Sequence, residues 1–267
     1  MHDNTSVKIV LNKQKGAIMQ REYITNEAWI KMLKFFNEHS RVYVGNPEKL
    51  KLFIEAIYWM ARSGAPWRML PEKYGNWNSI FKRFRNWVKK DIWEDLMHFC
   101  IKDPDLEHVM IDTTIVRAHA CSAGFGDQKE QGLGRSRGGF SSKIHAKVDA
   151  LGNPLKFIIT PGQESDFCQA NRMLGNVIGA YVLCDRGYDS DDFRNKIKNQ
   201  ECIPVIPGKR NRVAQIDYDK HIYKERSLVE CFFSKMKYYR RVFSRFDKSV
   251  ESFVAFLSFV GAILWLK

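Results

Sequence analysis

Residues 107–114 (EHVMIDTT), 143–151 (KIHAKVDAL) and 154–161 (PLKFIITP) decide the fold, because each is an apolar or alternating run of strand length. A Gly-Asn turn joins the last two runs. Helical sequence then alternates with two further apolar runs, at 180–185 and 202–206. Three strands in succession, followed by alternating helices and strands, predict a mixed five-stranded sheet flanked by helices, in the α/β class.

This order of elements is that of a ribonuclease-H-like sheet, and the sequence upstream of it reads as helices. The first helix is expected over 24–39, and Asn46-Pro47 supplies a cap and a first-turn proline for the second. A third helix is expected over 77–90, and Asp91 is expected to cap a short fourth one. We therefore expect three parts, which are a flexible extension over 1–21, a helical region over 22–104 and the RNase-H-like domain over 105–267.

The chain is strongly basic, with a formal net charge of +13 over 267 residues and an isoelectric point near 9.4. A polyanion such as DNA is the first partner to consider, although charge alone leaves a merely soluble basic protein equally open. The hydrophobic share of 45% is that of a folded chain. The six cysteines form no CxxC pair, which favours reduced thiols of a cytosolic protein over disulfides or a zinc site.

No membrane partner is expected from the sequence. The first 21 residues are polar and mixed in charge, without the apolar core of a secretory signal. The apolar run at 253–266 is too short to span a bilayer and suits a buried helix.

A polar stripe is expected on the helix that begins at Tyr223 and runs to residue 243. At ~100° per residue, Tyr223, Arg226, Glu230 and Lys237 fall within about 40° of one another. A carboxylate, a guanidinium, an ammonium and a phenol on one polar face could hold a metal ion together with the phosphates around it.

Two earlier aspartates, Asp112 and Asp185, each follow an apolar run and complete the set with Glu230. Metal-assisted phosphoryl transfer uses two hard divalent cations ~3.5–4 Å apart, held by carboxylates such as these. Taken singly, an aspartate after a strand is more often a turn or cap residue. Three further aspartates are interpreted in that ordinary way, as helix capping and a solvated first turn: Asp189, Asp191 and Asp192.

The combined motifs resemble the bacterial insertion-sequence transposases of the IS4 and IS5 groups, and the IS5 family in particular. Tyr223-x2-Arg226-x3-Glu230-x6-Lys237 matches their four-residue signature, and DRGYD from Asp185 matches their second acidic motif. IDTT around Asp112 matches the first motif. The segments GAPWR at 64–68, WNSIFKRF at 77–84, GLGRSRGG at 132–139 and KIH at 143–145 are similar to other parts of that group, so the resemblance covers about residues 22–267.

This resemblance implies a DDE transposase in which Asp112, Asp185 and Glu230 bind two Mg²⁺ ions, with Mn²⁺ as a possible substitute. Such an enzyme binds terminal inverted repeats, cleaves DNA by metal-assisted hydrolysis and joins the 3′-OH ends to target DNA. The resemblance also implies a homodimer or higher homo-oligomer in the bacterial cytoplasm, associated with the nucleoid. Tyr223, Arg226 and Lys237 would contact DNA phosphates, although i,i+4-type pairing on a solvated face is the alternative for Arg226 and Lys237.

Two other basic segments are candidates for DNA contact. The glycine-rich segment 124–139 has the wrong spacing for a nucleotide loop, which favours a flexible basic loop with Arg135, Arg137 and Lys143 near the DNA backbone. A disordered surface loop without a specific role remains the alternative. The helical region is expected to bind DNA in helix-turn-helix fashion through the helix over 77–90. The candidate contacts on that helix are Arg83, Arg85 and Lys89. A merely solvated basic face is the alternative.

Two other functions are compatible with the same residues. A metal-dependent nuclease would cut DNA without strand transfer. A non-catalytic DNA-binding derivative is a different class, and it has no need for three convergent carboxylates.

Overall fold

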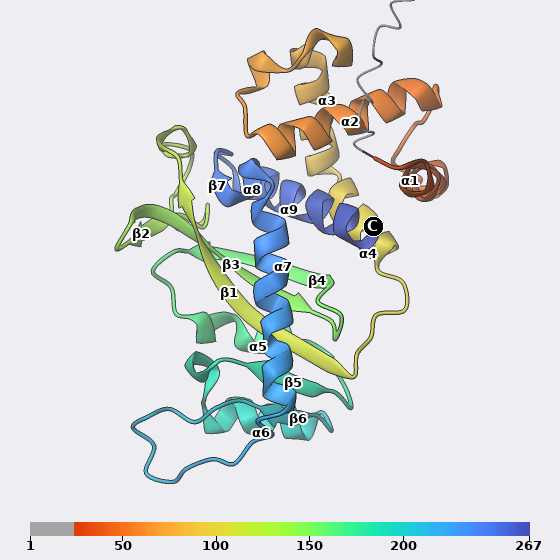
Figure 1. Cartoon of the computed structure of the whole chain (residues 1–267). Coiled ribbons are helices and arrows are strands. Elements are labelled where there is room, and N and C mark those ends of the chain that lie inside the picture. The colour runs from red at the N-terminus through yellow and green to blue at the C-terminus, as the bar shows by residue number, and fades with distance from the viewer. Residues whose placement is uncertain (1–23) are drawn as a thin grey trace, which may run out of the picture.

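The computed structural model describes residues 24–267, and the expectation of a flexible extension over 1–21 falls outside them. A mixed sheet crosses the molecule, with helices on both faces and the N-terminal helices gathered beyond one end of it (Figure 1). None of the helices within 24–267 has the length and apolar character needed to cross a bilayer.

The central strand of the sheet is β1 (His108–Ala118), and the main strand order is β4-β3-β1-β5-β6. β3 (Gly139–Val148) pairs antiparallel with both β1 and β4 (Pro154–Pro161). β5 (Tyr181–Cys184) pairs parallel with β1 and with β6 (Ile203–Val205). The five expected strands are therefore present in a mixed RNase-H-like sheet, which also includes two short strands, β2 (Gly134–Ser136) and β7 (Ser244–Arg245).

The segment expected to be a loop over 124–139 is partly ordered as a hairpin. β2 pairs antiparallel with the start of β3, with Gly139 at φ +97° in the turn. A β-carbon on Gly134 would meet the end of the Gln163 side chain, which would have to shift to admit a larger residue.

The N-terminal helices follow the sequence closely. They are α1 (Asn26–Glu38), α2 (Pro47–Ser63), α3 (Trp77–Lys89) and α4 (Ile92–Cys100). Asn46 caps α2 through Lys49 N, and Gly64 ends it in the left-handed conformation. Asp91 stands at the start of α4 as expected, but its backbone is left-handed and its side chain accepts no capping hydrogen bond.

Two expected helices are shorter than the apolar pattern suggested. The helix expected over 166–177 is a 3₁₀ turn at Asp166–Gln169 followed by α5 (Ala170–Leu174), which ends at Gly175. The long helix expected over 223–243 is divided into a 3₁₀ segment, η6 (Ile222–Arg226), then α7 (Ser227–Lys237) and α8 (Arg240–Phe243). The backbone stays helical from η6 into α7, so the stripe continues across Arg226 with the tighter winding of a 3₁₀ segment before it.

The apolar side chains form a core on each face of the sheet. On one face, alternate residues of β1 such as Met110 and Val116 pack with α7, α9 (Val250–Trp265) and the N-terminal helices. On the other face, Val109 and Ile111 pack with α5 and α6 (Asp191–Asn199). The expectation of a buried helix near the C-terminal end is confirmed by α9, which is buried along most of its length.

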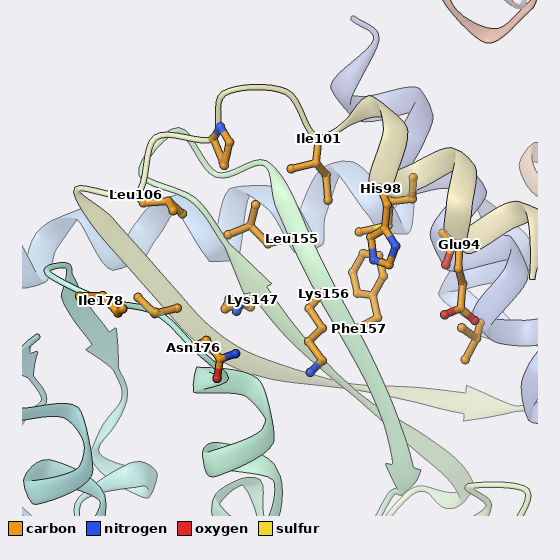
Figure 2. A pocket seen from close by; sticks show the side chains of 15 residues that line it. Glu94, His98, Ile101, Leu106, Lys147, Leu155, Lys156, Phe157, Asn176 and Ile178 are labelled. Carbon is orange, nitrogen blue, oxygen red and sulfur yellow. The ribbon is translucent and has the colours of Figure 1, made fainter. Parts of the chain in front are cut away.

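A cavity of about 740 Å³ lies where α4 and the segment after it meet the sheet, the end of α5 and α9 (Figure 2). Its wall includes two lysines of neighbouring strands. Lys156 Nζ donates to Arg172 O (2.9 Å) and Lys147 Nζ to Leu174 O (3.4 Å). These ammonium groups neutralise the carbonyl end of α5. We therefore interpret the cavity as a gap between packed elements and not as a binding site for an anion.

Asp189 is buried in an ion-pair cluster, which corrects its interpretation as a capping residue; Ser190 caps α6 instead. Its Oδ1 accepts from Arg194 Nε (2.9 Å) and its Oδ2 from Arg212 Nε (2.6 Å). Burial raises the pKa of Asp189, but these donors and Lys209 N outweigh it and lower the pKa to about 2. Because Arg212 belongs to the segment between β6 and η6, Asp189 anchors that segment to the sheet.

Replacing Asp189 with asparagine is expected to lower the free energy of unfolding by about 3 kcal/mol, because two guanidinium groups lose a buried carboxylate. Urea unfolding at pH 7 measures the difference. Asp191→Asn is the matched control, since Asp191 also pairs with Arg212 but its side chain is 76% exposed, and it should change stability by less than about 1 kcal/mol.

The same cluster predicts a pH dependence. Because the pKa of Asp189 is lower in the folded than in the unfolded protein, its charge stabilises the fold fully above the unfolded pKa of about 4. This stabilisation is lost as the pH falls toward the folded pKa of about 2. The difference between wild type and Asp189→Asn should therefore shrink over that interval. A constant difference would contradict the charge pairing.

Candidate functional site

Asp112 lies on β1 where the neighbouring strand β5 ends. The last parallel pair is Ile111 with Cys184, so Asp112 and Asp185 occupy the next positions on adjacent strands. Asp112 does not end its own strand, which corrects the reading of its motif: β1 continues to Ala118 because its other edge stays paired with β3. Beyond Ile111, β1 has no β5 residue beside it, and this opening exposes the site.

Arg226 joins two of the predicted carboxylates. Its Nη1 donates to Asp112 Oδ2 (2.8 Å), and its Nη2 donates to Glu230 Oε1 in a short contact. Arg226 ends η6 and Glu230 lies in the first turn of α7, so the two side chains are one helical turn apart and Arg226 links Glu230 to β1. Asp112 and Arg226, which are 114 positions apart in the sequence, thus form a direct ion pair.

The environment of Asp112 opposes its negative charge. Burial raises its pKa to about 6, while the Thr113 N–H and Arg226 act in the opposite direction. The neighbouring charges of Asp185 and Asp166 add to the rise. A carboxylate in this position is stabilised by a cation, and in the structure Arg226 supplies it.

Asp185 has a different local role in the structure. It follows β5 directly and caps a short 3₁₀ turn, η5 (Arg186–Tyr188), by accepting from Gly187 N at 2.8 Å. Its charge acts on both Asp112 and Tyr223, which places it near the cluster without a direct bond to Arg226.

The two outer members of the stripe flank this cluster. The Arg226 guanidinium lies 5.8 Å from the centre of the Tyr223 ring, whose pKa is raised by burial. Lys237 ends α7, seven residues after Glu230 and therefore about 10 Å farther along the helix. The structure brings Tyr223, Arg226 and Glu230 to Asp112 and leaves Lys237 at a distance.

A divalent cation fits part of this arrangement. Within residues 24–267 no three His, Cys, Asp or Glu side chains are grouped closely enough to hold a metal ion. Asp112 and Glu230 nevertheless share one cation already, the guanidinium of Arg226, and carboxylates are the ligands that Mg²⁺ prefers. The donor set is thus suited to a hard cation, with Arg226 in the place that the cation would take.

Asp166 is a fourth acid near Asp112 that the sequence analysis did not single out. Its Oδ1 accepts from Lys143 Nζ (2.6 Å) and from Thr113 Oγ1 (2.8 Å). Lys143, expected near DNA, is 7% exposed on β3 and held by this pair, so we leave it out of the DNA contacts. The acid at the start of an expected helix looked like an ordinary first-turn residue, which hid its role.

The remaining basic candidates divide into packed and exposed side chains. Arg83 lies over the rings of Phe53 and Trp87, 4.4 and 5.1 Å from their centres, and burial lowers its pKa. Lys89 is exposed, and Arg85 is half-buried beside a cavity. Arg135 and Arg137 are exposed and share a hollow of about 630 Å³ with Arg117, an arginine that the sequence analysis missed.

The sequence matches two protein-family models, which together cover most of the described chain. Residues 24–97 match the model described as "Putative transposase of IS4/5 family", and residues 103–265 match the model described as "Transposase DDE domain".

Individual proteins give the same picture. The Brucella ovis protein described as "Putative transposase for insertion sequence element IS6501" is 39% identical over 132 residues, covering 48% of this chain and 99% of the relative. A Burkholderia cepacia protein, described likewise for element IS402, is 28% identical over 128 residues, or 43% of this chain and 58% of the relative. Among solved structures, the piggyBac transposase synaptic complex with hairpin DNA aligns with a TM-score of 0.41 and 12% identity, over 72% of this chain and 50% of that one.

Replacing Arg226 with alanine is expected to raise the pKa of Asp112 above its value of about 6, because the cation that favours the charged carboxylate is lost. NMR titration of the carboxyl carbons measures this, with Asp112→Asn to assign the signal. Lys237→Ala removes a cation from the far end of α7 and should leave the titration unchanged. An unaltered pKa in Arg226→Ala would contradict the ion pair.

Proposed function

Because this chain belongs to the IS4/IS5 family of DDE transposases, we propose that Asp112, Asp185 and Glu230 are its catalytic carboxylates. They would serve cleavage of DNA at the ends of an insertion sequence and joining of those ends to target DNA. The observation that carries the proposal is the cation that Asp112 and Glu230 share, next to Asp185 at the open end of β5.

The bound group would be a divalent metal, which transposases of this family generally use. We propose Mg²⁺, with Mn²⁺ as a substitute, held by Asp112, Asp185 and Glu230. When bound, the ions would activate the attacking oxygen and stabilise the leaving one. The chain's own part is to hold three carboxylates on rigid elements, one on β1, one after β5 and one on α7.

Arg226 and Tyr223 would bind the DNA backbone beside the cut. Arginine can fork onto a phosphate, and Arg226 already lies within reach of Asp112 and Glu230. Lys237 would act as a point charge on a phosphate farther along α7, since its position is about 10 Å beyond Glu230.

The hollow of Arg117, Arg135 and Arg137 supplies a second contact surface for the DNA backbone. It is lined by Arg117 near the end of β1 and by the β2–β3 hairpin, and β7 pairs with β1 at Arg117. These guanidinium groups are exposed, so they are available to phosphates. The partners proposed are the terminal inverted repeats and target DNA, acted on by a homodimer or larger assembly of this chain.

A duplex carrying the element's inverted repeat should be nicked only with Mg²⁺ or Mn²⁺ present. Asp112→Ala, Asp185→Asn and Glu230→Gln are each expected to reduce cleavage at least ~1,000-fold, because each removes an anionic ligand of the reacting site. Duplex binding without metal should be retained. Gel analysis of end-labelled duplex and electrophoretic mobility shifts measure the two properties.

Glu225→Gln is the matched control, because Glu225 is an exposed acid in η6, five residues before Glu230. It should cut at the wild-type rate. Cleavage by Asp112→Ala would remove the proposed metal role of that residue. Products in which the labelled 3′ end is joined to a second DNA would distinguish a transposase reaction from plain nuclease activity.

The salt dependence of duplex binding tests the arginine hollow. Removing one phosphate contact, as in Arg137→Gln, should reduce the slope of log K against log salt by about 0.9, because one counterion fewer is released. Lys198→Gln removes an exposed cation from α6, outside the hollow, and should leave the slope unchanged. Equal slopes in wild type and Arg137→Gln would exclude Arg137 as a contact.

A further inference from the structure

A pocket of about 520 Å³ lies between the helical region and the sheet domain, away from the carboxylates. Residues of four chain segments line it. These segments are the one after α2 (residues 64–67), α3 itself, the one after β1 (residues 119–121) and residues 241–252. Its volume is in the range of small-molecule sites, which favour junctions between domains. We call it the junction pocket.

Aromatic rings line much of the junction pocket. Trp67 and Phe81 form one wall, with ring centres 5.0 Å apart, and both are only partly buried. His119 and Phe246 also line the pocket, with ring centres 5.3 Å apart and the rings tilted by 37°, and a hydrogen bond from Cys121 N to His119 Nδ1 (3.2 Å) fixes the imidazole. Flat walls of this kind suit a planar aromatic ligand.

The charge of the pocket is positive. Its carboxylate, Asp247, is held by both Nε and Nη2 of buried Arg241, each at 3.0 Å, so this pair adds no net charge. Arg85 and Lys248 also line the pocket, and Lys248 is exposed. The ligand should therefore combine a planar ring with an anionic group, because the rings offer stacking and the two cations offer charge-assisted hydrogen bonds.

We propose that the junction pocket binds a single nucleotide, with the base between the aromatic walls and the phosphate at Arg85 and Lys248. The nucleotide could be one unit of bound DNA with its base unstacked, or a free nucleotide. The first source rests on the proposed function; the second does not.

The position of the pocket is compatible with a DNA source. His119 directly follows β1, and the six residue steps from Asp112 to Ala118 span about 20 Å at the rise of a strand. That length corresponds to about six base-pair steps of duplex at 3.4 Å each. The arginine hollow includes Arg117, two residues before His119, so a DNA backbone that contacts the hollow would pass close to the pocket.

Binding of free deoxyadenosine monophosphate to the full chain without metal tests the pocket directly. Titration calorimetry should show saturable binding that Arg85→Gln weakens at least ~10-fold. Cys121→Trp, which places an indole in the pocket, should abolish it. Lys89→Gln, one helical turn from Arg85 and outside the pocket, and Cys121→Ser should bind like wild type.

The DNA source is tested with inverted-repeat duplexes that carry 2-aminopurine at successive positions. An unstacked base brightens, so one position should brighten on binding by wild type and Cys121→Ser but not by Arg85→Gln or Cys121→Trp. Binding of the monophosphate supports the pocket as a site for a free nucleotide, and a brightened position in the duplex supports it as a site for one unit of bound DNA. Equal responses from Arg85→Gln and wild type, or no response in both arms, overturn the proposal. A chain that binds the monophosphate yet cuts no DNA would refute the proposed function alone.

Discussion

Asp112 is a carboxylate on the central strand of a sheet whose two faces are both covered by apolar side chains, so a cation must lie close to it. Burial raises its pKa to about 6, and two further aspartates push in the same direction. The opposing interactions are the Thr113 N–H and Arg226. The elements packed around β1 place the Arg226 guanidinium next to the Asp112 carboxylate.

The cation comes from a segment that lies far along the chain. Arg226 closes a 3₁₀ segment whose start is fixed by Asp219, which accepts hydrogen bonds from His221 N and Ile222 N. The turn into α7 then places Glu230 on the same guanidinium. Arg226 and Glu230 lie one helical turn apart and share an ion-pair cluster with Asp112, whereas Lys237 lies about two turns farther along α7. The spacing along the helix therefore separates the residues of the carboxylate cluster from one that can serve only at a distance.

The sequence predicted the five main strands because each depends on local pattern, and it pointed to three acidic residues whose catalytic role stays a proposal. Alternation identified the strands, and the signature spacing identified Arg226 and Glu230 as neighbours. Long-range partners were not accessible in this way. The burial of Asp189 depends on Arg212, twenty-three residues away, and that of Lys143 on Asp166. Local pattern cannot show such pairs, so Asp189 looked like a cap and Lys143 like a surface lysine.

The helical region and the sheet domain share one core, which bears on how a transposase could act at a defined distance from a bound sequence. α9 packs against both α4 and β4, and buried Arg241 joins the two parts by donating to Ala65 O at 3.0 Å while it holds Asp247. Separating the two parts would expose this apolar surface and would leave the buried Arg241–Asp247 ion pair without its partner in the helical region. Both changes are unfavourable. DNA held by the helical region would therefore keep a fixed register relative to Asp112. In such an arrangement the cleavage position follows from the rigidity of the shared core, without any recognition of bases at the carboxylates themselves.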